Sequence, residues 1–228
     1  MSSEPLHEEE VESRLEAAPV VAVAMALQLA LALTSLHEDW KTWDFDWWIW
    51  LIPVVPEGAF FAINAFKRPH RTLQQMGIRR EAGIILAGFA SATNAFLVFA
   101  VLASLISGRE RSGAQLLLKG LTVWTTNVIL FGIWYWLFDR GGPVRRIRPD
   151  APPPDFQFPQ MENPELAAPG WRPHFVDYMY VSFTNSIAFS PTDAMPLSRW
   201  AKLLMLFESA ISVVVVLLVA ARAVNIFK

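Results

Sequence analysis

Apolar residues along this chain fall into five long windows, separated by shorter stretches in which polar residues dominate. The windows cover residues 18–36, 47–66, 83–107, 115–138 and 200–227. Each has about the 20 mostly apolar residues that a helix needs to cross a bilayer. Tryptophans and tyrosines gather at several window ends, as in GIWYWLFD, where their rings prefer the membrane interface. With 54% of residues apolar, too few polar residues remain to cover five such helices in a soluble core. The pattern predicts an all-α integral membrane protein with five transmembrane helices.

The stretch before the last window has a different character. Residues 174–189 are apolar and aromatic but too few to cross the bilayer, and the sequence SPTDAMP follows them at once. Non-helical backbone at membrane depth must line water or be buried in protein. A re-entrant half-helix fits this length, and the alternative is an amphipathic helix that lies on the membrane surface. We therefore expect one re-entrant pore helix and a filter-like loop in addition to the five spans.

The order of these elements resembles the pore module of the tetrameric potassium-channel superfamily. In that family a serine in the pore helix is followed by the filter, then by Asp, two residues and Pro, and then by Trp, a small residue and a basic one. The same order occurs here at Ser182, Asp193, Pro196, Trp200, Ala201 and Lys202. The resemblance covers the last part of the chain plus an outer helix in the fourth window. It implies a homotetramer around a central pore, since one chain supplies only one pore loop.

The resemblance places the filter on residues 188–192, where the sequence departs from the family. The family's two filter glycines are replaced by Ser190 and Thr192, and Pro191 between them is held at φ of about −65°. The oxygen ligands expected here are carbonyls, hydroxyls and one carboxylate, from Ser186, Ala188, Phe189, Ser190, Pro191, Thr192 and Asp193. We therefore expect a cation channel with altered selectivity among potassium, sodium and calcium.

Asp193 has two interpretations. In a tetramer it would form a ring of carboxylates that attracts cations. Alternatively, it is a helix N-cap or Asx-turn residue with Pro196 behind it.

Two further carboxylates lie inside predicted spans. Glu208, in the last window, is expected level with the half-helix, where bonds to Thr184, Asn185 or Ser186 would brace the filter from behind. It could instead face an aqueous cavity, or be a protonated structural carboxyl that bonds a neighbouring helix. Glu57 follows two prolines in the second window, and a broken helix that carries a carboxylate is a candidate proton or ion site.

Two other functions fit parts of the sequence. A secondary or proton-coupled transporter would use Glu57 and Glu208, although no internal repeat is visible. A non-conducting membrane adaptor would present residues 152–154, the sequence PPP, to a partner in an extended polyproline form. No catalytic motif, cysteine or ligand-like histidine spacing is present, so we expect no enzyme, cofactor or resident metal, and no nucleic acid as partner.

The expected organisation has three parts: an acidic tail (1–17), a three-span accessory membrane domain (18–114) and a pore-like module (115–228). The module comprises an outer helix (115–138), a proline-rich loop (139–173), a re-entrant helix and filter (174–196) and an inner helix (200–227).

The distribution of charge conflicts with the family's topology. Five spans place the amino terminus, the loop after the second window and the long loop 139–199 on one face, which carries most of the lysines and arginines. The positive-inside rule makes that face cytoplasmic, whereas potassium channels insert the pore loop from outside. Either the loop enters from the cytoplasm, or the charge rule fails, or a span is miscounted, and we favour the last two. The basic cluster would also suit lipid phosphates. We expect an integral protein of a prokaryotic inner membrane.

Overall fold

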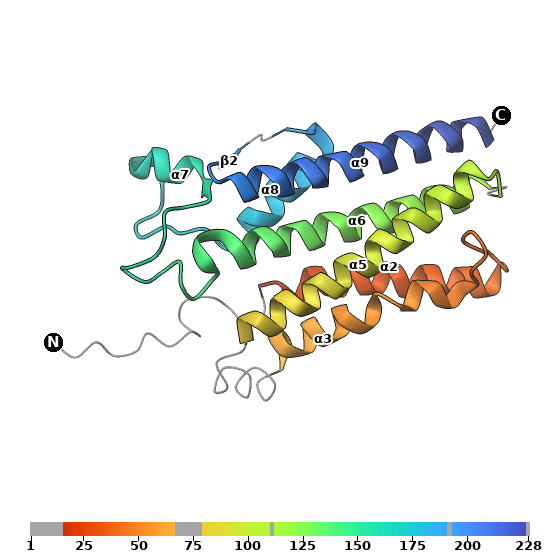
Figure 1. Ribbon diagram of the computed structural model, residues 1–228, viewed down its shortest axis with the longest axis horizontal. Coiled ribbons are helices and arrows are strands. Elements are labelled where there is room, and N and C mark those ends of the chain that lie inside the picture. The colour runs from red at the N-terminus through yellow and green to blue at the C-terminus, as the bar shows by residue number, and fades with distance from the viewer. Residues whose placement is uncertain (1–15, 67–78, 110–111, 191–192, 227–228) are drawn as a thin grey trace.

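The computed structural model of this chain describes residues 16–66, 79–109, 112–190 and 193–226 (Figure 1). It is built around five long apolar helical segments. The segments long and apolar enough to span a membrane are Ala18–His37, Trp47–Ala65, Arg79–Ile106, Gly113–Gly141 and Arg199–Arg222. They coincide with the five predicted windows, so the helical fold class and the five spans are confirmed. The described residues give no support to a miscounted span, and the conflict between charge and pore orientation stands.

The second span is broken into two helices. A short 3₁₀-helix, η1 (Trp47–Leu51), ends just before α3 (Val54–Ala65) begins. Pro53 is the N-cap of α3 and Pro56 lies in its first turn. Because the first N–H groups of a helix have no intrahelical partner, prolines are tolerated there but not further inside. The two prolines therefore end one helix and start the next.

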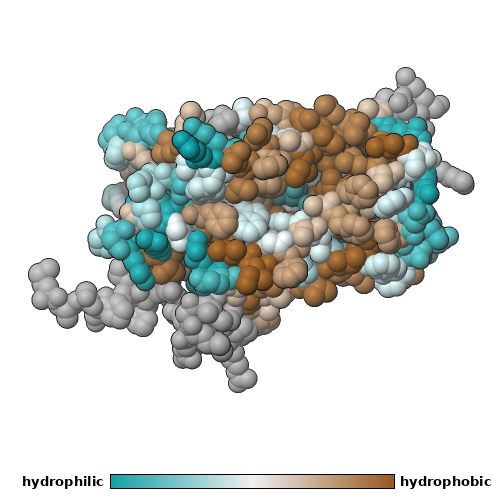
Figure 2. Space-filling model, in the orientation of Figure 1, coloured by the Kyte–Doolittle hydropathy of each residue, from teal (hydrophilic) through white to brown (hydrophobic). Residues whose placement is uncertain are grey.

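The other spans are single helices: α2 (Ala18–His37), α5 (Arg79–Ile106), α6 (Gly113–Phe138) and α9 (Arg199–Ile226). Helix α6 lies at the centre and packs against α9, α5 and α2, and against the shorter α8 (Phe175–Ala188). Of the apolar window of α6, 67% is buried, against 28–39% in the other four spans. The exposed apolar surface of the outer helices forms a band between two polar ends (Figure 2).

Glycines on α6 allow its close packing with α9 and α8. A Cβ atom on Gly120 would lie 2.6 Å from Cγ1 and 3.2 Å from Cβ of Val219 on α9. A Cβ atom on Gly132 would lie 2.5 Å from Sδ and 3.4 Å from the main-chain Cα of Met179 on α8. Small residues at such positions let helix backbones approach in a bilayer.

Replacing Gly120 with alanine is therefore expected to destabilise the fold by about 1–3 kcal/mol, because the β-branched Val219 cannot move aside by rotating a long side chain. Gly88→Ala is the matched control, since its Cβ atom would meet nothing within 4 Å. The control should be neutral or slightly stabilising, because alanine is the better helix former. Thermal unfolding of both variants in the same detergent measures the difference, and equal stability would contradict this account of the α6–α9 contact.

A folded cap covers one end of the bundle. It contains η2 (Asp139–Gly141), the short helices α7 (Pro159–Glu162) and η3 (Pro164–Leu166), and an antiparallel pair of two-residue strands. In that pair β1 (Phe156–Gln157) aligns Phe156 with Pro196 of β2 (Met195–Pro196). The proline-rich stretch takes part in the cap, since the Arg140 Nε donates to the Pro152 carbonyl over 3.1 Å. Pro153 is exposed and Pro152 and Pro154 are partly buried, and the adaptor hypothesis stays a prediction.

Candidate functional site

Helix α8 is the segment expected to be re-entrant. Its 14 residues give a length of about 21 Å, whereas the hydrocarbon core is about 30 Å thick. At its start, Glu16 accepts from the Phe175 N–H over 3.1 Å, and Asp177 accepts from the His174 N–H over 2.7 Å. Burial raises the pKa of the Asp177 carboxyl, and the His174 N–H bond lowers it by a smaller amount. Both carboxylates complement the positive end of the helix dipole.

Helix α8 ends partway along the length of the bundle, at its surface. Phe189 terminates it in the left-handed conformation, with φ of 55°, and the Phe189 N–H bonds the Asn185 carbonyl over 3.0 Å. The last turns of α8 lie level with Glu208, which is about 14 Å along α9 from Arg199 at a rise of about 1.5 Å per residue. The chain then returns to the cap, where Leu197 donates to the Asp155 carbonyl over 2.8 Å. In Figure 1 the turn after α8 lies partway along α9, within the apolar band of Figure 2.

The predicted filter residues fall into two groups. Ala188, Phe189, Ser190 and Asp193 are exposed on the single chain. Ser186 lies apart from them, because it is fully buried and its hydroxyl donates to Glu208. The predicted ligands Pro191 and Thr192 lie outside the described residues.

A buried polar network surrounds Glu208, whose side chain is fully enclosed. The Tyr135 hydroxyl donates to Oε2 over 2.5 Å, and the Asn185 amide donates to the same oxygen over 2.7 Å. The Ser186 hydroxyl lies 3.0 Å from Oε1, and the Ser182 hydroxyl is bonded to Oε1 as well. Helices α6, α8 and α9 therefore meet at one carboxyl group.

The hydrogens in this network can be counted. The Ser182 Oγ has one proton but contacts two oxygens, the Val128 carbonyl at 2.7 Å and Glu208 Oε1. If that proton goes to the carbonyl, which can only accept, the contact with Oε1 is a hydrogen bond only when Glu208 donates. With a neutral Glu208, both oxygens that contact the Ser182 Oγ have a hydrogen bond to it. With an ionised Glu208, one of these two contacts joins two oxygens without a proton between them. The hydrogen-bond geometry favours the interpretation of Glu208 as a protonated structural carboxyl.

Of the three residues predicted to bond Glu208 and brace the filter, the structure brings two into contact with it. Asn185 and Ser186 contact Glu208, and the second N–H of the Asn185 amide donates to the Met205 carbonyl over 3.0 Å. Thr184 does not contact Glu208, because its hydroxyl bonds the Tyr180 carbonyl of its own helix over 2.8 Å. Glu208 thus anchors α8 by contacting side chains on the buried side of that helix.

Sequence reasoning missed Tyr135 as a partner of Glu208. We expected the GIWYWLFD tyrosine at the membrane interface, but Tyr135 is fully buried and its hydroxyl reaches α9. Its helix places Trp136 and Leu137 inside as well, so the aromatic run marks a packed core rather than an interfacial belt. The sequence did show an acid in one span and a tyrosine in another, which are groups that need a partner when buried. It did not indicate that these two would meet.

A second buried cluster joins α6 to the cap. Asp139 is fully buried, and its Oδ2 accepts from the Tyr178 hydroxyl over 2.6 Å and lies 4.0 Å from the Arg146 guanidinium. Arg146 also bonds the Tyr178 hydroxyl and the Trp136 carbonyl, and it lies over the Tyr178 ring with Cζ 4.8 Å from the centroid. Asp139 Oδ1 accepts from the Asp155 N–H over 2.9 Å. The cluster fixes the cap on the bundle and holds the start of α8.

Glu57 lies in a third buried cluster, between α2, α3 and α6. Its Oε1 accepts from the Gln28 amide over 2.9 Å, and the same amide lies 3.3 Å from the Thr126 hydroxyl. The second oxygen, Oε2, has no hydrogen-bond partner among the described residues. Beside Glu57 is a cavity of about 10 Å³, otherwise lined by apolar side chains, which is the volume of about one water molecule.

The described residues contain no group of three or more histidine or acidic side chains that could hold a metal ion. Comparisons of this chain with protein-family models, with curated proteins and with solved structures found no match.

Proposed function

We propose that this chain is an oligomeric cation channel in which the turn after α8 lines the ion pathway. The observation that carries the proposal is the exposure of Ala188, Phe189 and Ser190 at the C-terminal end of α8. Helix α8 ends at Ala188, so the carbonyls of its last turn have no partner further along the helix and need one that lipid does not supply. Another copy of the chain or a water-filled pathway would cover them, and a symmetric channel supplies both.

The polarity of α8 supports cations as the permeant species. At its first turn, beside the folded cap, Glu16 and Asp177 accept main-chain N–H groups, and its C-terminal end lies partway along the bundle, exposed on the single chain. The C-terminal end of a helix carries a partial negative charge, which favours a cation nearby. The exposed Asp193 adds a carboxylate on the returning segment. In a tetramer these charges repeat around one axis.

The exposed side of α8 supports an oligomer. Val176, Tyr180, Phe183 and Ile187 are 69%, 53%, 47% and 52% exposed and follow one another at helical spacing. This apolar stripe adjoins the exposed turn, so a second copy that covers the turn would also bury the stripe. We propose a homotetramer in a prokaryotic inner membrane, by the resemblance to the potassium-channel superfamily.

The Glu208 network supports the pathway from behind. Four side chains of α6 and α8 converge on one carboxyl of α9, which holds α8 at a fixed depth. A pore helix must be rigid because small displacements alter the ligand distances that determine ion selectivity.

Asp193→Asn is expected to lower cation conductance several-fold and to shift the reversal potential between potassium and sodium, because it removes one charge from each subunit. The measurement is current through the purified full chain in planar bilayers, with calcium tested as a third cation. Asp150→Asn is the matched control, since Asp150 is an exposed carboxylate in the cap, away from the turn. The control should conduct as the unaltered protein does.

Two results would overturn the proposal. One is the absence of current from a folded tetramer with every cation tested. The other is conduction that Asp193→Asn and Ser190→Gly leave unchanged, because the pathway would then lie elsewhere.

A proton-coupled transporter is the second candidate, and the unpartnered Oε2 of Glu57 is the observation that favours it. A carboxyl beside a break between η1 and α3 could take up a proton when the two helices move. A silent bilayer, together with proton-driven uptake into liposomes that Glu57→Gln abolishes, would favour this function over the channel.

A further inference from the structure

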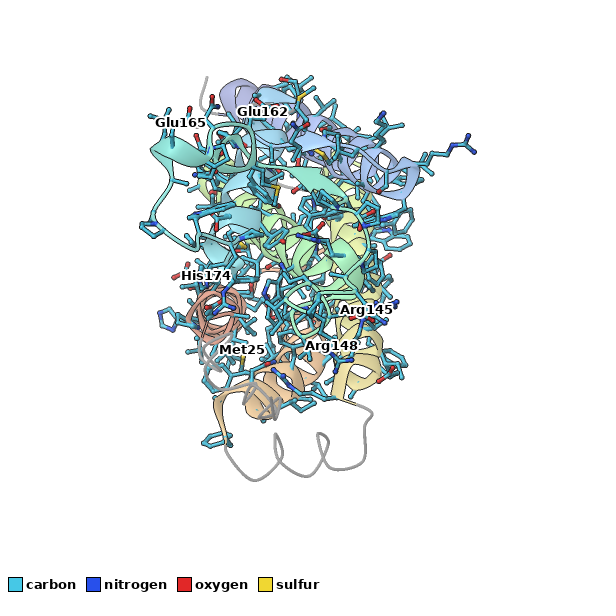
Figure 3. The ribbon with its side chains drawn as sticks, turned by 90° about the vertical axis from the view of Figure 1, so that its left-hand side faces the viewer. Met25, Arg145, Arg148, Glu162, Glu165 and His174 are labelled. Carbon is cyan, nitrogen blue, oxygen red and sulfur yellow. The ribbon has the colours of Figure 1, made fainter. Side chains whose placement is uncertain are left out.

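A pocket of about 320 Å³ opens at the capped end of the bundle, where α3 ends, α5 begins and α6 passes into the cap. Its wall includes Arg79, Arg80, Arg145 and Arg148, and no aspartate or glutamate lines it among the described residues. Figure 3 looks onto this end and shows Arg145 and Arg148 near one another, while the acidic Glu162 and Glu165 lie at the opposite edge of the cap. The pocket therefore concentrates positive charge.

Three of the four arginines lack an acidic partner among the described residues. Arg80, Arg145 and Arg148 form no ion pair with any described residue, and all three are exposed. Arginines elsewhere in the structure do form such pairs: Arg109 pairs with Asp44, and Arg146 lies beside Asp139. Guanidinium groups held around one pocket repel one another, so an anion bound between them lowers the free energy of the whole arrangement.

Two glycines shape the arginine wall. Gly141 and Gly142 have φ of +82° and +101°, which side chains rarely adopt. A Cβ atom on Gly141 would lie 2.8 Å from Cδ of Arg145, and one on Gly142 would lie 3.2 Å from Nε of Arg80. The turn thus brings arginines of the cap and of α5 to the same opening, although 65 positions separate Arg80 from Arg145 in the sequence.

Apart from Asn64, the other side chains that line the pocket are apolar. Phe60 and Ile63 of α3 line it, together with Trp136 and Leu137 of α6. These helices belong to the membrane spans, so the pocket lies at the boundary between the apolar band and the polar end. A cationic opening over an apolar wall suits a ligand with an anionic head and an apolar body.

We propose that this pocket binds a phosphate group, supplied either by the headgroup of an anionic phospholipid or by a free phosphate compound. Arg145 and Arg148 of the cap and Arg80 of α5 contact the phosphate oxygens. Arginine suits this role because its planar donors match two phosphate oxygens at once. The acyl chain of a lipid would extend along Phe60 and Ile63. This site lies on the α3–α5 side of the bundle and does not depend on the proposed channel.

The test is calorimetric titration of the purified full chain in nanodiscs of phosphatidylcholine. The probes are dihexanoyl phosphatidylglycerol, dihexanoyl phosphatidylcholine and inorganic phosphate. Binding of phosphatidylglycerol alone identifies an anionic lipid, and binding of inorganic phosphate as well identifies a site for free phosphate compounds. In either case Arg145→Gln/Arg148→Gln should weaken binding by about tenfold for each arginine removed, and added salt should weaken it further.

Arg199→Gln is the matched control, because Arg199 is exposed at the same end of the bundle but outside the pocket. This variant should bind phosphatidylglycerol or inorganic phosphate as tightly as the unaltered protein does. Absence of binding by both phosphatidylglycerol and inorganic phosphate would overturn the proposal. So would equal binding of the two lipids, or equal weakening in the control, because the pocket arginines would then contribute nothing specific.

Discussion

Glu208→Ala is expected to destabilise the fold by about 2–4 kcal/mol, a large share of the stability of a domain of this size. The substitution leaves the donors of Tyr135, Asn185 and Ser186 without their acceptor in a buried site. A bilayer offers these groups no water, although the unfolded chain in a membrane also finds partial partners, which limits the effect. Loss of the side chain also creates a cavity where α6, α8 and α9 meet.

Glu208→Gln distinguishes a neutral carboxyl from an ionised one. A glutamine oxygen can accept from Tyr135 and Asn185, and its amide can donate to Ser182, as the protonated acid does, and to Ser186, whose hydroxyl oxygen then accepts. We therefore expect Glu208→Gln to cost less than about 1 kcal/mol if the acid is neutral. The measurement is unfolding of each variant in the same mixed micelles, with the exposed Glu165→Ala as a control that should change nothing. A glutamine variant as unstable as the alanine variant would contradict the hydrogen assignment in this network.

Arg146→Met is the other substitution with a large expected effect. It leaves Asp139 buried without the guanidinium that lies 4.0 Å from its Oδ2, and breaking one side of a buried ion pair costs about 3–5 kcal/mol. The Tyr178 hydroxyl and the Trp136 carbonyl lose a donor at the same time. We expect the cap to loosen first, with faster hydrogen exchange in β1 and β2 than in α6.

The double variant Asp139→Asn/Arg146→Met tests whether the effect comes from an unpaired charge. Removing both partners often costs less than removing one, so the double variant should be more stable than Arg146→Met by about 1–3 kcal/mol. Arg199→Met is a control at the same end of the bundle, since Arg199 is exposed and is not one of the residues that contact Asp139. Additive effects of the two substitutions would show that Arg146 acts through packing on Tyr178 rather than through charge.

The two carboxylate clusters differ in how far the sequence predicted them. Glu208 was expected beside Asn185 and Ser186, because counting residues from the half-helix and from the start of the last span places them at one depth. Asp139 and Arg146 read as ordinary charges of a polar loop, yet both are buried. The six residues between them include the turn at Gly141 and Gly142, and only the path of that turn brings the two charges together.

The filter prediction shows a related limit. Ser186 and residues 188–193 were predicted together as oxygen ligands of one ion pathway, and the structure separates the buried Ser186 from the exposed Ala188 and Ser190. Ser186 and Ala188 both belong to α8, and two residues along a helix correspond to a rotation of about 200°, so one faces the bundle and the other faces away from it. The order of residue types does not show that the helix continues to Ala188, because a helix end depends on a few local contacts.

By itself the sequence determined the number, order and approximate limits of the spanning helices. The reason is physical: in a bilayer each backbone N–H and C=O group needs a partner within its own segment, so a long apolar window can satisfy them only as a helix. The tertiary structure alone decided which polar side chains meet. Tyr135 and Glu208 lie 73 positions apart, and Gln28 and Thr126 lie 98 apart. Such pairs form only after the helices have packed in one rotation and at one depth, which depends on the shapes of all the surfaces in contact.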